Sequence, residues 1–278
     1  MSSNFLESFI KLIPFFVGVF IYFYFPPKQL PFLQRASIKC FPILALMGFL
    51  YLRKTKNSDE YKCRKLILSG LALSCIGDAF LIQKNLFIPG MLAFALAHFM
   101  YILALGFHLV ELKCGCLLYG ICIVNGKQVN CCGDILERKS LTLQLYENLL
   151  KKHIFPGKSN ICMCVYLVLY ILMPGLTGPL IYAVPIYGFI LATMTWRSLA
   201  AMNTYKIESW WLSRITGIGG LLWMTSDAVL AYNKFVDEVP YQDALIMVSY
   251  YLGQLGITLS SLICWRKYDG LMGAKKSK

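Results

Sequence analysis

The stretch LALSCIGDAFLIQ, from Leu71 to Gln83, places one carboxylate, Asp78, inside a run apolar enough to cross a membrane. A second stretch, GLLWMTSDAVLAYNK from Gly220 to Lys234, does the same with Asp227. An ionisable side chain in the hydrocarbon core is costly, and membrane proteins keep one there mainly where it has a function. The two stretches therefore predict a membrane protein with acidic groups in its interior.

The composition of the whole chain favours the same class of protein. Of its 278 residues, 58% are hydrophobic and 15% are charged, whereas a soluble domain has about 25% charged residues. The net charge of +13 fits basic residues at cytosolic helix ends better than a nucleic-acid partner, because no basic run interleaved with aromatic residues lies outside the apolar segments. We expect one integral membrane domain over residues 1–278, all-α, with an uncleaved first span.

Eight segments are long and apolar enough to cross the membrane as helices of about 20 residues. If the N-terminus is cytosolic, 22 of the 27 lysines and arginines fall on the cytosolic side, as orientation by basic residues requires. The sequence therefore predicts a polytopic protein with both termini in the cytosol. The eight predicted spans are 9–25, 36–52, 66–83, 86–108, 161–177, 179–201, 215–233 and 243–264, with PGLTGP at 174–179 separating the fifth from the sixth.

Two segments outside the spans carry further predictions. Residues 113–160 form a cytosolic insert between the fourth and fifth spans, and its cysteines lack the paired C-x-x-C spacing of a zinc site. The chain ends in KKSK at 275–278, a dilysine pattern that coat machinery reads as a signal for retrieval to the endoplasmic reticulum. A generic basic tail on anionic lipid is the alternative reading of the tail.

The two aspartates belong to an internal repeat. SCIGDAFL around Asp78 aligns with MTSDAVL around Asp227, and each aspartate follows a basic residue, Lys65 or Arg214, by 13 positions. At about 1.5 Å per residue both carboxylates lie roughly 20 Å into the membrane, in its non-cytosolic half. This pattern predicts two similar four-helix halves that face each other across a pseudo-two-fold axis.

Two carboxylates that meet in a medium of low dielectric do not both ionise easily, so the pair can supply a general acid and a general base together. We predict Asp78 and Asp227 as the catalytic pair. The few other polar groups of the spans are candidates for binding substrate, although packing or snorkelling would also explain them. These candidates are Lys39, His98, Tyr101, Tyr187 and Arg197. No cofactor is expected, and no metal, because the three histidines are not at ligand spacing.

Five motifs carry a resemblance to a known family: KCFPIL (39–44), GLALSCIGDAFL (70–81), FALAHFMY (94–101), YGFILATMTWRSLA (187–200) and LWMTSDAVLAYNKF (222–235). They resemble the YhhN-like lysoplasmalogenases, the transmembrane protein 86 group of animals. The resemblance implies an eight-helix enzyme of the endoplasmic reticulum membrane that hydrolyses the vinyl-ether bond of lysoplasmalogens, lysophospholipids of choline or ethanolamine. It places the family's paired aspartates on Asp78 and Asp227. The insert at 113–160 departs from the family, whose members have a short loop there.

The sequence leaves other functions open. An intramembrane aspartyl protease also pairs two aspartates, but neither Asp78 nor Asp227 lies in the G-x-G-D signature of such proteases. A proton-coupled transporter would use repeats, buried carboxylates and helices broken near the midplane. A purely structural membrane protein is the third alternative, and the sequence also leaves open whether the chain forms a homodimer.

Overall fold

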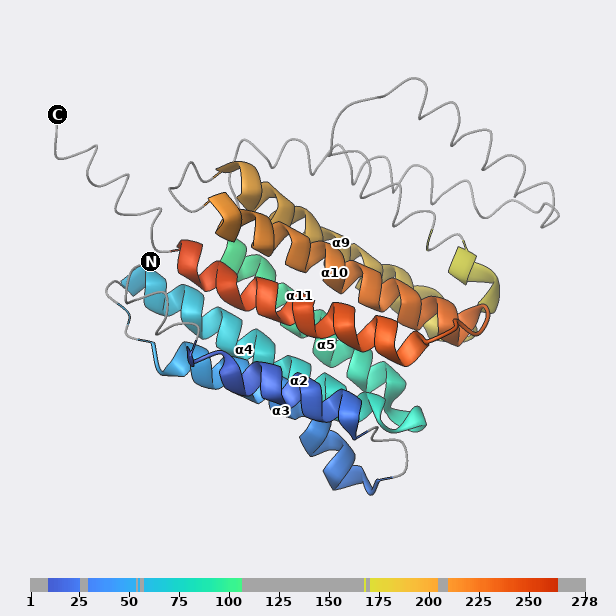
Figure 1. Cartoon of the computed structure of the whole chain (residues 1–278). Helices are drawn as coiled ribbons and strands as arrows, with labels where there is room; N and C mark the ends of the chain where they lie inside the picture. Colours follow the sequence, from blue (N-terminus) through green and yellow to red (C-terminus); the bar gives the residue numbers. More distant parts are fainter. Residues whose placement is uncertain are drawn as a thin grey trace, which may run out of the picture. The chain divides into compact units, whose positions relative to one another are not determined.

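A computed structural model of the chain describes residues 10–25, 30–53, 55, 58–106, 168, 171–204 and 210–264. Within these ranges the regular structure is helical throughout, in seven long helices and two short 3-10 turns (Figure 1). The long helices are α2 (Ile13–Tyr24), α3 (Phe32–Tyr51), α4 (Ser58–Leu81), α5 (Phe87–Leu105), α9 (Leu180–Thr204), α10 (Trp210–Phe235) and α11 (Gln242–Cys264). The short turns are η2 (Lys84–Leu86) and η3 (Met173–Gly175).

Each long helix overlaps one of the predicted spans, and the predicted break at 174–179 is confirmed by η3 and by Gly178, whose φ is 57°. The helix α4 begins eight residues before its predicted span, at Ser58. Its first turn carries Asp59 and Glu60, whose negative charges suit the N-terminus of a helix. Hydropathy marks the part of a helix that lies in lipid, whereas the helix itself continues into the interface.

The apolar content is uneven among these helices. Four of them, α3, α5, α9 and α11, are long and apolar enough to cross a membrane by length and composition. The helices α4 and α10 are long enough, but they carry the two aspartates and several small polar residues. The protein is therefore a polytopic, all-α membrane protein in which the two least apolar long helices hold the acidic groups.

The packing repeats between the two halves of the chain. In the first half α4 packs against both α3 and α5, and in the second half α10 packs against both α9 and α11. The halves meet where α5 contacts α9 and where α11 contacts α3 and α4. The contact of α5 with α9 thus corresponds to the contact of α11 with α3 when the two halves are exchanged.

The helices α10 and α11 cross with their backbones in direct contact. A Cβ atom added at Gly256 would lie 2.7 Å from Cα of Gly219, and one added at Gly253 would lie 2.8 Å from the ring of Trp223. Small residues at such a crossing let two backbones pack directly against each other inside a membrane. This contact fixes α11 against the helix that carries Asp227.

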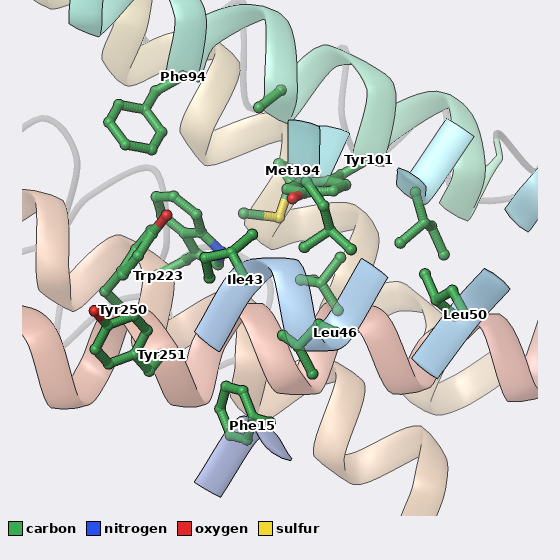
Figure 2. Packing of buried hydrophobic residues seen from close by; sticks show 14 of the residues in the cluster. Phe15, Ile43, Leu46, Leu50, Phe94, Tyr101, Met194, Trp223, Tyr250 and Tyr251 are labelled. Carbon is green, nitrogen blue, oxygen red and sulfur yellow. The ribbon is translucent and has the colours of Figure 1, made fainter. Parts of the chain in front are cut away.

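The core consists of apolar side chains from all these helices (Figure 2). Ile43, Leu46 and Leu50 of α3 are fully buried. Near them three aromatic rings from different helices pack edge to face: Phe94 of α5 lies 5.7 Å from Trp223 of α10, and Trp223 lies 4.9 Å from Tyr250 of α11, measured between ring centroids. The buried cluster therefore reaches the level of the aspartates.

The chain divides into two compact units, one made of residues 1–106 and 171–278 and the other of residues 107–170. All the long helices named above belong to the first unit. The predicted insert at 113–160, most of the predicted span at 161–177, and the C-terminal KKSK lie outside the described residues.

Candidate active site

Asp78 and Asp227 line one cavity of about 380 Å³ in the first unit. The sequence predicted that the two carboxylates meet at one level of the bundle, and the structure brings them to the same cavity. Helices α2, α3, α4, α5, α10 and α11 all contribute to its wall. The lining residues besides the aspartates include Tyr22, Phe23, Arg35, Lys39, Phe94, Trp223, Ser226, Asp243, Met247 and Tyr250.

Asp78 lies one turn before the end of α4 and is 2% exposed. Its Oδ1 lies 3.1 Å from Nζ of Lys39, which comes from α3. Its Oδ2 accepts a hydrogen bond of 2.5 Å from the hydroxyl of Tyr250 on α11. A buried carboxylate is tolerable as an anion when a cation and a hydrogen-bond donor compensate for its lost hydration, and Asp78 has both.

Behind Tyr250 a chain of buried polar groups fixes the direction of its hydroxyl. Nε2 of Gln254 donates to the Tyr250 oxygen over 3.3 Å, and Oε1 of Gln254 accepts a 2.8 Å hydrogen bond from the hydroxyl of Tyr101. The Tyr101 hydroxyl also lies 3.3 Å from Oγ of Ser74. Because the amide nitrogen can only donate, the hydrogen of Tyr250 is directed to Asp78.

Asp227 has different neighbours. Its Oδ2 accepts a hydrogen bond from the hydroxyl of Tyr187 on α9, and Nε2 of His98 on α5 lies 3.6 Å from the same oxygen. His98 and Tyr187 also contact each other, at 3.1 Å. The side chain of Asp227 is 14% exposed, and among the described residues no lysine or arginine forms an ion pair with it.

The predicted site residues fall into three groups. Lys39, His98 and Tyr187 each contact one of the two aspartates. Tyr101 is fully buried and reaches Asp78 only through Gln254 and Tyr250. Arg197 is buried with its guanidinium 5.2 Å from the ring of Trp196 and does not line the cavity. Ten residues separate it from Tyr187 on α9, about 15 Å along the axis.

Sequence reasoning missed Tyr250 and Gln254. They are four residues apart on α11, so they share one face of that helix. Two hydrogen-bonding side chains at this spacing in an apolar span were the signal that would have found them. Arg35 and Asp243 were also missed, because each lies near the end of a predicted span, where a charged residue needs no special explanation.

The helix that carries Asp227 is continuous. The helix α10 extends without interruption from Trp210 to Phe235, through the glycines at 217, 219 and 220. The broken helix that a proton-coupled transporter would place near its substrate is therefore not found in α10. The cavity with its two carboxylates remains the feature that a function has to explain.

The matches to known proteins include the residues of this site. The YhhN family profile matches residues 34–127 and 149–261. Lysoplasmalogenase TMEM86A of Bos taurus is 32% identical over 255 residues, which are 91% of this chain and 88% of that protein. Lysoplasmalogenase TMEM86B of Homo sapiens is 32% identical over 253 residues, 90% of this chain and 86% of that protein. No solved structure matches the chain.

Proposed function

The chain belongs to the YhhN family, and from that premise we propose that it is a lysoplasmalogenase, which hydrolyses the vinyl-ether bond of a lysoplasmalogen to a fatty aldehyde and a glycerophospho-base. The relatives that support this activity are themselves named lysoplasmalogenases and match about nine tenths of the chain. The observation that carries the proposal is that two carboxylates with different neighbours line the same cavity beside apolar rings.

Vinyl-ether hydrolysis needs an acid before it needs a nucleophile. A proton adds to the β-carbon of the double bond, and the resulting oxocarbenium ion then takes up water. The hemiacetal so formed collapses to an aldehyde and an alcohol. Glycosidases meet the same demand, a proton donor and an anion around an oxocarbenium ion, with two carboxyl groups.

The different surroundings of the two aspartates support a division of these tasks. Asp78, paired with Lys39 at 3.1 Å, is the ionised partner, which stabilises the oxocarbenium ion and takes a proton from the attacking water. Asp227, held by Tyr187 and without a lysine or arginine partner among the described residues, is the acid that protonates the β-carbon.

Collapse of the hemiacetal restores both groups. The Asp227 carboxylate takes the hydroxyl proton of the hemiacetal, and protonated Asp78 gives its proton to the departing glycerol oxygen. Asp227 ends protonated and Asp78 ionised, as at the start, so no other proton donor is required. His98 and Tyr187 position Asp227, and Tyr250 positions Asp78.

The wall of the cavity suits an alkenyl chain. Phe94, Trp223 and Met247 contribute apolar surface beside the carboxylates. An apolar chain binds such a surface because its transfer out of water is favourable. The distribution of lysines and arginines further supports a multi-pass membrane protein with both termini cytosolic and the cavity in the non-cytosolic half.

The test uses the purified full-length chain in lipid nanodiscs. It is given 1-alkenyl-glycerophosphocholine in D₂O, and the released aldehyde is analysed by mass spectrometry. We expect aldehyde with one deuterium at carbon 2, because the proton added to the β-carbon comes from an acid in exchange with solvent. Ester-linked and saturated ether-linked lysophosphocholine serve as controls and should yield no aldehyde.

Absence of aldehyde from an inserted, folded protein would reject the activity. Aldehyde that carries no deuterium at carbon 2 would reject the acid step while leaving the activity in place.

A further inference from the structure

We propose that the outer part of the cavity is a head-group subsite, in which Arg35 binds the phosphate and Asp243 with Tyr22 binds the cationic base of a zwitterionic lysophospholipid. This inference rests on the proposed function, because the same cavity would hold the vinyl ether of the substrate. Arg35, Asp243 and Tyr22 all line the cavity together with the two aspartates.

The subsite lies where three helices end. The helix α2 ends at Tyr24, α3 begins at Phe32 and α11 begins at Gln242. Tyr22 is therefore in the last turn of α2, and Arg35 and Asp243 are in the first turns of α3 and α11. Helix ends are the level at which a membrane protein meets lipid head groups.

The two basic residues of α3 that line the cavity lie at different depths. Arg35 precedes Lys39 by four residues, about one helical turn or 6 Å toward the helix end. Lys39 is 16% exposed and its ammonium already contacts Asp78. A glycerol unit separates the vinyl ether from the phosphate in a lysoplasmalogen. With the double bond beside the aspartates, that unit extends toward Arg35, whose planar guanidinium matches phosphate geometry.

The negative charge of Asp243 suits the cationic base of the head group. Asp243 is exposed at the start of α11 and lines the cavity together with Tyr22 and Arg35. The Tyr22 ring packs edge to face against Tyr251, with centroids 5.5 Å apart, which fixes its orientation. An aromatic ring beside a carboxylate is the usual environment for a quaternary ammonium group.

Three substrates separate the two contacts of the head group: 1-alkenyl-glycerophosphocholine, 1-alkenyl-glycerophosphate, which lacks the cation, and 1-alkenylglycerol, which lacks both charges. We expect R35A to raise the KM of both phosphate-containing substrates about tenfold more than that of 1-alkenylglycerol. D243N should raise only the KM of the phosphocholine substrate, by about threefold because Asp243 is exposed. R35K should recover part of the loss.

Two matched variants control for charge alone. K62A replaces a lysine that is 72% exposed in the first turns of α4. E238Q replaces an exposed glutamate between α10 and α11. Neither should change the KM of any of the three substrates. Equal effects of R35A on all three substrates, or of D243N on both phosphate substrates, would overturn the head-group subsite.

A binding measurement keeps this inference separate from the proposed activity. If the wild-type protein releases no aldehyde from any substrate, the proposed function fails. The subsite is then tested by thermal stabilisation with saturated ether-linked lysophosphocholine. Stabilisation that R35A and D243N reduce supports the subsite, and stabilisation that both variants retain overturns it. Competition by inorganic phosphate as strong as that by glycerophosphocholine would reduce the subsite to a phosphate site and overturn the assignment of the base.

Discussion

Asp78 and Asp227 occupy corresponding places in two helices that repeat each other, yet their neighbours differ in charge. Each aspartate receives one contact from the long helix that precedes its own, Lys39 from α3 or Tyr187 from α9. Each also receives one from the last long helix of the other half, Tyr250 from α11 for Asp78 and His98 from α5 for Asp227. The repeat thus determines where the contacts come from, and the side chains determine what they do.

One repeat can therefore yield two chemical roles. A lysine on one side and a tyrosine on the other leave one carboxylate paired with a cation and its counterpart paired with a neutral hydroxyl. Catalysis by a carboxyl pair requires such a difference, because an acid and a base cannot act together while both are in the same protonation state.

The largest effect is expected from replacing either of the two carboxyl groups. D78N and D227N should each lower the rate of aldehyde release by about a thousandfold, since general acid–base groups contribute about 10² to 10⁴ in rate. The rate is measured on purified protein whose insertion and thermal unfolding match the wild type. D237N, in the exposed loop after α10, is the control and should retain activity. A D78N or D227N protein with a tenth of the normal rate would show that the pair is not required.

The second effect distinguishes the two aspartates by stability. K39M should lower the free energy of unfolding by about 2 kcal/mol, because it leaves the buried Asp78 without its cation. The value is below that for a fully buried pair because Lys39 is 16% exposed. The double variant K39M/D78N should regain most of the loss, whereas adding D227N to K39M should not. Equal recovery by D78N and D227N would remove the asymmetry.

The third effect compares the two tyrosines. Y187F and Y250F each remove one hydroxyl from a carboxylate, at Asp227 and Asp78 respectively, and each should lower kcat about tenfold. KM should change little, because neither hydroxyl is assigned to the head group. A rise in KM with unchanged kcat would instead assign that tyrosine to substrate binding. Y232F, on the surface of α10, is the control.

The smallest effect is expected at Tyr101, which reaches Asp78 only through Gln254 and Tyr250. Y101F removes the donor to Gln254 and should lower kcat about threefold with KM unchanged. The double variant Y101F/Y250F should be no slower than Y250F alone, since the path from Tyr101 to Asp78 passes through Tyr250. Additive losses would mean that Tyr101 acts independently of Tyr250.

The fold and the aspartates were predictable because a charge in an apolar segment stands out. Asp78, Asp227 and Lys39 are ionisable residues in or beside the spans, and the repeat gave the two acids one depth. Tyr250 was harder to predict, since tyrosine is an ordinary core residue and only the packing of α11 shows which carboxylate it faces. Arg197 lies in the same helix as Tyr187, but about three turns away from it, so nearness in the motif did not mean nearness to the site.

The crossing of α10 and α11 has a consequence for these contacts. With Gly219 against Gly256 there is no room for even one added methyl group, so the helix that carries Asp227 packs backbone to backbone against the helix that carries Tyr250. The position of Asp227 relative to Tyr250, whose hydroxyl donates to Asp78, is therefore set by main-chain packing rather than by side-chain rotamers. A bulkier residue at this crossing would shift the contacts of both carboxylates at once without contacting either of them.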